Sequence, residues 1–118
     1  MPNRMNLFVI HTPDLHATKQ FYQQIGLKLT PEKHREGLDH FSSFFANGTV
    51  FKIYPGEKSR GGIGFETTQF EQVSQHATEA SLSPTFVTRH GRRCLILRDP
   101  DGRRVEIFET FCSDSSTG

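Results

Sequence analysis

The sequence predicts a small α+β protein built from two tandem β-α-β-β-β modules. Three observations support this fold class. The 118 residues match the length of one domain. Short apolar runs, typical of strands, alternate with two stretches of helical spacing. The same order also occurs twice: a shift of 55 residues places Phe8 on Ile63, and a shift of 54 places Asn47-Gly48 on Asp101-Gly102.

The first half of the chain predicts one strand, one helix and three further strands. The apolar run Leu7–Ile10 ends before Thr12-Pro13, which is typical of a strand followed by a capped helix. Apolar residues then recur at helical spacing over residues 15–25. Asn47-Gly48 indicates a hairpin turn. We expect the three remaining strands over residues 27–34, 39–46 and 49–55.

The second half repeats this order. We expect a helix over residues 69–80 and strands over residues 63–67, 84–89, 93–98 and 103–109. Residues 56–62 are rich in glycine and charge, and they separate module one (5–55) from module two (62–110). Together the modules are expected to form a single domain over residues 1–112. The small polar residues 113–118 predict a flexible tail.

Composition excludes several classes of function. The formal net charge is +1, so we expect no binding to nucleic acid. The apolar run at residues 7–10 is too short for a signal peptide or a membrane span. Cys94 and Cys112 are too few for a disulfide framework and indicate reduced thiols. We therefore expect a cytoplasmic protein without membrane contacts.

Four segments, in this order and spread over nearly the whole chain, resemble one known family. They are Thr12-Pro13-Asp14-Leu15, Phe21-Tyr22 with Gly26-Leu27, the strand Val50–Pro55, and the closing stretch Asp99–Phe108. The sequence resembles the glyoxalase/bleomycin-resistance/extradiol-dioxygenase family, the vicinal oxygen chelate superfamily. The resemblance implies cup-shaped mixed sheets with helices on the outer face and a pocket enclosed by the modules. It also implies a homodimer, which would cover open sheet edges.

The resemblance further implies where metal ligands would lie. Family metalloenzymes use His, Glu or Gln on the first and last strand of each module, and those positions here are Leu7, Lys52, Gly62 and Glu106. Only Glu106 can coordinate a metal ion, so we expect no metal cofactor. The alternative is a divalent metal at a displaced site formed by His11, His40 and Glu106.

Strand alternation predicts which side chains face the cup. The expected ligand-binding residues are His11, His40, Phe44, Lys52, Tyr54, Glu106 and Phe108. Lys52 and Glu106 are equivalent in the repeat and are expected to form an ion pair or to orient a ligand. A cluster of arginines near the last two strands predicts either a solvated sheet end or an anion subsite: Arg89, Arg92, Arg93, Arg103 and Arg104.

The function expected from these features is metal-independent binding of a small organic molecule, as in family members that sequester antibiotics. Phe44, Tyr54 and Phe108 would stack on the ligand. The alternative is a lyase, isomerase or dioxygenase-like enzyme with a relocated metal or with acid-base chemistry at His11 and His40. A third class is an accessory protein that acts through protein contacts.

Overall fold

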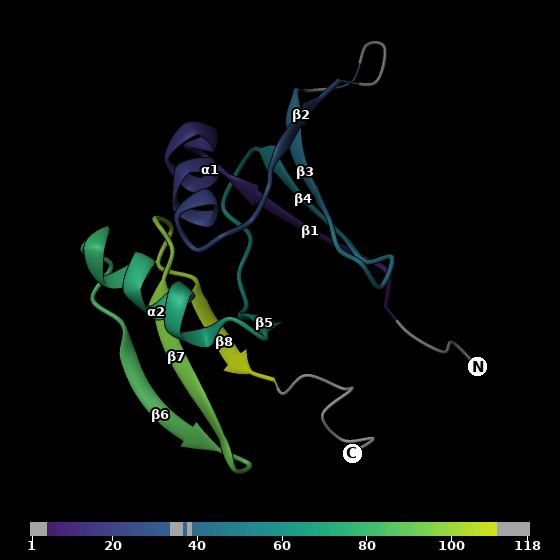
Figure 1. Cartoon of the computed structure of the whole chain (residues 1–118). Helices are drawn as coiled ribbons and strands as arrows, with labels where there is room; N and C mark the ends of the chain where they lie inside the picture. The colour runs from purple at the N-terminus through teal and green to yellow at the C-terminus, as the bar shows by residue number, and fades with distance from the viewer. Residues whose placement is uncertain (1–4, 34–36, 38, 111–118) are drawn as a thin grey trace. The chain divides into compact units, whose positions relative to one another are not determined.

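The computed structural model describes residues 5–33, 37 and 39–110. The chain divides into two compact units between Arg60 and Gly61, inside the predicted linker 56–62. Each unit has the order β-α-β-β-β and one four-stranded mixed sheet, with its helix against one face of that sheet (Figure 1). The predicted α+β class and the two-module organisation are confirmed. The tail 113–118 lies outside the described residues.

Unit 1 contains β1 (Leu7–Thr12), α1 (Leu15–Gln24), β2 (Thr30–Glu32), β3 (His40–Phe44) and β4 (Val50–Pro55). Its sheet has the order β1-β4-β3-β2, with β1 parallel to β4 and the other pairs antiparallel. At the start of α1 the carboxylate of Asp14 accepts the backbone N–H of Ala17 at 3.0 Å, which satisfies one unpaired donor of the first turn.

The second strand of unit 1 is much shorter than predicted. Residues 27–29 were expected in the strand, but only Thr30–Glu32 pair with β3. The Leu27 N–H bonds instead to the Tyr22 carbonyl at 3.0 Å, which completes the end of α1. Pro31 lacks an N–H, which an edge strand tolerates. Residue 34 lies outside the described residues.

Unit 2 contains β5 (Ile63–Thr67), α2 (Phe70–Glu79), β6 (Thr85–Arg89), β7 (Arg92–Arg98) and β8 (Arg104–Glu109). Its sheet has the order β5-β8-β7-β6, with β5 parallel to β8. The register repeats that of unit 1: Phe8 lies beside Phe51, and the equivalent Ile63 lies beside Val105. The internal repeat seen in the sequence is therefore a structural repeat.

Each sheet buries one face under its helix. In unit 1 the Tyr22 ring packs edge-on against Phe51, with centroids 5.2 Å apart, and Ile53 is fully buried. In unit 2 the Phe70 ring of α2 contacts Phe86, and Ile107 is buried. Alternate residues must point to the opposite face. We call that opposite surface the helix-free face of each unit.

The structure contains two helices among the described residues, each of 10 residues. Neither has the length and apolar content that would let it cross a membrane.

Candidate ligand-binding faces

The helix-free face of unit 1 carries the side chains predicted to face the cup. Ser42 lies opposite Lys52, and Phe44 lies opposite Val50, so the predicted phase of β3 is confirmed. Leu7 lies on the other side of Val50. Leu7, Val50 and Phe44 thus form an apolar row across three strands, in which Leu7 is 48% and Phe44 62% exposed.

A polar cluster centred on Glu32 lies on the same face. The carboxylate Oε1 accepts a hydrogen bond from Ser42 Oγ at 2.6 Å and lies 3.1 Å from His40 Nε2. The Lys52 ammonium lies 3.9 Å from the same oxygen. His40 is only 1% exposed, whereas Lys52 is half-buried. The carboxylate therefore satisfies buried polar groups and offsets the charge of Lys52.

Sequence reasoning did not find Glu32. Strand alternation could have located it. Thr30 pairs with Ser42, so Glu32, two residues further along the strand, lies on the same face as Ser42 and Lys52. For the expected strand over residues 27–34, the sequence did not indicate which alternate side chains face the helix. The register with β3, which sets that phase, depends on long-range pairing.

Tyr54 lies between two imidazole rings. Its ring is stacked on His40, with centroids 4.2 Å apart and an interplanar angle of 13°. On the neighbouring strand β1, His11 is stacked at 5.8 Å. Because β4 lies between β1 and β3, the two imidazoles flank the ring from opposite sides. Both faces of the Tyr54 ring therefore lie against imidazoles, a packing that the sequence did not predict.

The helix-free face of unit 2 is dominated by arginine. Glu106 accepts a hydrogen bond on Oε1 from Arg89 Nη1 at 3.0 Å and on Oε2 from Arg104 Nε at 2.9 Å. Both carboxylate oxygens are therefore bonded to a guanidinium. The Arg92 guanidinium lies 5.0 Å from the centroid of the Phe108 ring and pairs with Glu66 at 2.7 Å. These contacts form a network of hydrogen bonds between guanidinium and carboxylate groups. Charge-assisted hydrogen bonds of this kind are stronger than hydrogen bonds between neutral groups.

The predicted arginine cluster is divided between different surroundings. Arg93 lies toward α2, pairs with Glu71 and Glu109, and stacks over Phe70. Hydrogen bonding to Glu109 and Glu71 raises the pKa of Arg93, and the hydrogen bond from Arg93 lowers the pKa of Glu109. Arg103 is 1% exposed and forms an ion pair with Asp99. Each of the five arginines is paired with a carboxylate, and all of them except Arg103 remain partly exposed to solvent.

Lys52 and Glu106 both lie on helix-free faces, as predicted. Each has an oppositely charged partner inside its own unit, Glu32 for Lys52 and two arginines for Glu106. A direct pair between Lys52 and Glu106 would join the two units and stays a prediction. Across the described residues, no group of three or more His, Cys, Asp or Glu side chains is arranged to hold a metal ion.

Cys94 is a buried thiol on β7, beside Phe108 in the register. Burial raises the pKa of Cys94, and the nearby negative charge of Glu106 raises it further. A buried thiol with a raised pKa is a poor nucleophile. Cys112 lies outside the described residues.

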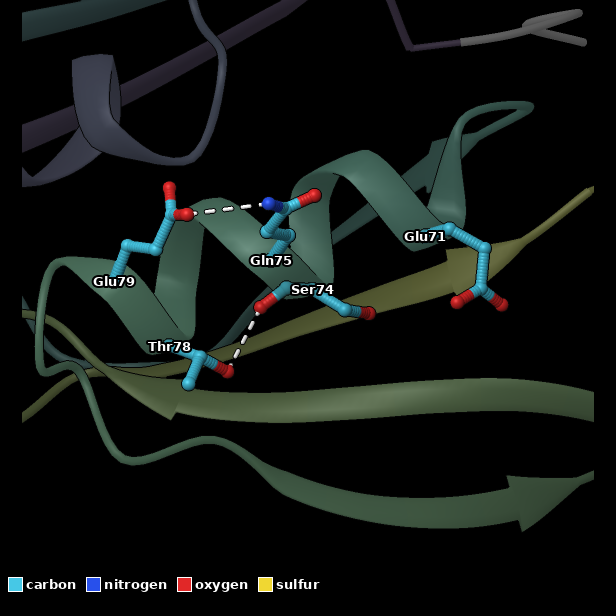
Figure 2. A pocket seen from close by; sticks show the side chains of 5 residues that line it. All are labelled: Glu71, Ser74, Gln75, Thr78 and Glu79. Carbon is cyan, nitrogen blue, oxygen red and sulfur yellow. Dashed lines mark hydrogen bonds between the residues drawn. The ribbon is translucent and has the colours of Figure 1, made fainter.

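A hollow on the surface of α2 does not resemble a ligand site. Figure 2 shows that its lining comes from one helix: Glu71, Ser74, Gln75, Thr78 and Glu79. Hydrogen bonds link Gln75 to Glu79 and Thr78 to the Ser74 carbonyl along the same helix. No apolar side chain lines the hollow, which small-molecule sites normally require.

No family model and no curated protein matches the sequence. Solved structures do match the fold. Oxidase ChaP-H2 has a TM-score of 0.76 at 18% identity, over 93% of this chain and 95% of that one. A lactoylglutathione lyase from Agrobacterium tumefaciens has a TM-score of 0.73 at 15% identity, over 92% and 94%. A glyoxalase/dioxygenase from Nostoc punctiforme has a TM-score of 0.70 at 17% identity, over 90% of each chain. The fold is therefore the one seen in these oxidase, lyase and glyoxalase/dioxygenase structures, as the resemblance implied.

Replacing Glu32 tests the polar cluster. Glu32→Ala should destabilise the protein by about 1–3 kcal/mol, because buried Ser42 and His40 lose their partner. Thr30→Ala is the matched control, since Thr30 is exposed on the same strand and face, and it should change stability by less than about 0.5 kcal/mol. Urea unfolding of both variants measures this. Equal effects would contradict a specific role for Glu32.

Proposed function

We propose that the protein binds a small organic molecule on its helix-free faces without using a metal ion. One observation carries this proposal: both oxygens of Glu106 accept hydrogen bonds from guanidinium groups. A metal ion at this carboxylate would have to replace two charge-assisted bonds. The other three positions implied by the family resemblance hold Leu7, Lys52 and Gly62. The side chains at these positions offer no atom that readily coordinates a metal ion, so nothing would offset the loss of those two bonds.

The helix-free face of unit 1 supplies both apolar and polar contacts for such a ligand. Leu7, Val50 and Phe44 form the apolar row, and two of these side chains are exposed. Lys52 lies nearby, and its 3.9 Å separation from Glu32 exceeds hydrogen-bond distance, so its N–H donors remain available to a ligand. An apolar surface with a few convergent polar groups is typical of small-molecule sites.

Catalysis is the second candidate, and one contact favours it. The His40 imidazole lies 3.1 Å from the Glu32 carboxylate, an arrangement that orients a histidine for acid-base chemistry. His11 is exposed and is the imidazole that a substrate would reach. The similar structures described as a lyase, an oxidase and a glyoxalase/dioxygenase support this candidate only through the shared fold.

Binding can be tested with the neutral apolar dye Nile red, whose fluorescence rises in an apolar site. We expect saturable binding to the native protein. Phe44→Ala should weaken it about fivefold or more, because truncating a central aromatic contact typically costs at least about 1 kcal/mol. Phe86→Ala is the matched control, since Phe86 is 56% exposed but lies toward α2 in unit 2. No saturable binding, or an equal loss in both variants, would contradict the proposed surface.

We also propose that the protein is a homodimer. Each sheet has two edge strands within its own unit, and exposed edges are prone to pairing unless they are covered. The family that the sequence resembles, in which cup-shaped sheets of paired modules face each other, also supports a homodimer. Sedimentation velocity at micromolar concentration should give a species of twice the 13.4 kDa chain mass. A single 13.4 kDa species over the whole concentration range would contradict the proposal.

A further inference from the structure

We propose that the helix-free face of unit 2 recognises an anionic group, a phosphate monoester or a carboxylate, on the small molecule that the protein binds. The inference rests on the proposed function and specifies the chemical class of the ligand. The strands of this face carry four guanidinium groups and only two carboxylates. The cations are Arg89, Arg92, Arg98 and Arg104, and the anions are Glu66 and Glu106.

The charge on this face exceeds that of the chain. Four guanidiniums against two carboxylates leave an excess of two positive charges, whereas the formal net charge of the protein is +1. Positive charge is therefore concentrated on one surface of one unit. A surface of this kind attracts small anions and raises their local concentration.

The arginines on this face keep most of their hydrogen-bond donors. A guanidinium has five N–H groups. Arg89 uses Nη1 to reach Glu106, and Arg104 uses Nε, and neither guanidinium forms a hydrogen bond to another described residue. The two side chains are 41% and 37% exposed. Their remaining N–H groups are thus available to the planar or tetrahedral oxygens of an anion, which a guanidinium binds in bidentate fashion.

Glu106 acts as a positioning residue in this arrangement. Two guanidiniums repel each other, and a carboxylate that accepts one bond from each holds them side by side. The side chain of Ile96 lies directly across the register from Glu106 and is half-buried, so it offers apolar surface beside the anion site. The ligand expected here is an anionic group attached to an apolar body.

The internal repeat shows that the arginine face is particular to unit 2. The strand pair Phe44 and Val50 of unit 1 is equivalent to the pair Arg98 and Arg104 of unit 2. Lys52 is likewise equivalent to Glu106. The same fold position thus carries an apolar row in one unit and an arginine row in the other. This difference indicates that the two faces are chemically distinct, with an apolar surface in unit 1 and an anion-binding surface in unit 2.

The experiment is calorimetric titration of the native protein with phenyl phosphate, benzoate and phenol at low ionic strength with EDTA present. Phenyl phosphate or benzoate should bind, and phenol should bind at least tenfold more weakly because it lacks the anion. The tighter of the two anions identifies the recognised group. Added salt should weaken the binding.

Variants locate the site. Arg104→Gln and Arg89→Gln should each lower anion affinity at least fivefold, and Arg104→Lys, which keeps the charge but loses the fork, should have an intermediate affinity. Arg93→Gln is the matched control, since Arg93 lies toward α2, and it should leave affinity unchanged. Circular dichroism checks that each variant is folded. An equal loss in Arg93→Gln and Arg104→Gln would overturn the proposed site.

Three further outcomes are decisive. Anion binding that requires added Mn²⁺ and disappears in Glu106→Gln would replace the arginine site with a metal-mediated one and overturn the inference. Binding of Nile red without binding of any anion would overturn the inference and leave the proposed function intact. Failure of Nile red and of all three phenyl compounds would overturn both.

Discussion

The burial of one face of each sheet beneath a helix is the constraint on which the rest of the structure depends. Phe51 and Ile53 in unit 1, and Val105 and Ile107 in unit 2, must face their helices to bury their apolar surface. Because side chains alternate along a strand, the residues between and beside them are forced to the other face. This is how Lys52 and Glu106, charged residues in apolar strands, reach the helix-free faces.

Charge compensation inside each unit then determines what those faces can do. A half-buried charged group is costly unless it is paired. Unit 1 meets this requirement with Glu32, whose single oxygen Oε1 lies near Ser42, His40 and Lys52. Unit 2 meets it with two arginines around Glu106. The same fold position is thus a donor-bearing lysine in one unit and a carboxylate occupied by guanidiniums in the other.

The fold was largely predictable because it depends on local patterns and on a repeat. Apolar spacing located both helices and seven of the eight strands to within a few residues, and the shift of 54 or 55 residues predicted which positions of the two units are equivalent. The exception, Thr30–Glu32, is a short edge strand in which proline interrupts the pattern.

The candidate site was less predictable because its contacts are long-range. Alternation placed Lys52, Tyr54 and His40 on the correct face. It could not show that Tyr54 is flanked by two imidazoles, since that depends on the order of three strands. It also missed the bond from Arg89 to Glu106, because Arg89 is 17 residues distant in sequence. Ligand identity depends on such side-chain networks more than on the fold.

The central claim is that Glu106 holds two arginines and does not bind a metal ion. Elemental analysis of the native protein, purified without chelator and then dialysed against Ni²⁺, Zn²⁺, Fe²⁺ or Mn²⁺, tests it most directly. The account predicts substoichiometric metal for every ion, with no difference between the native protein and Glu106→Ala, because one carboxylate without further donors cannot hold a divalent ion against water. One equivalent of metal on the native protein that is lost in Glu106→Ala would contradict the account.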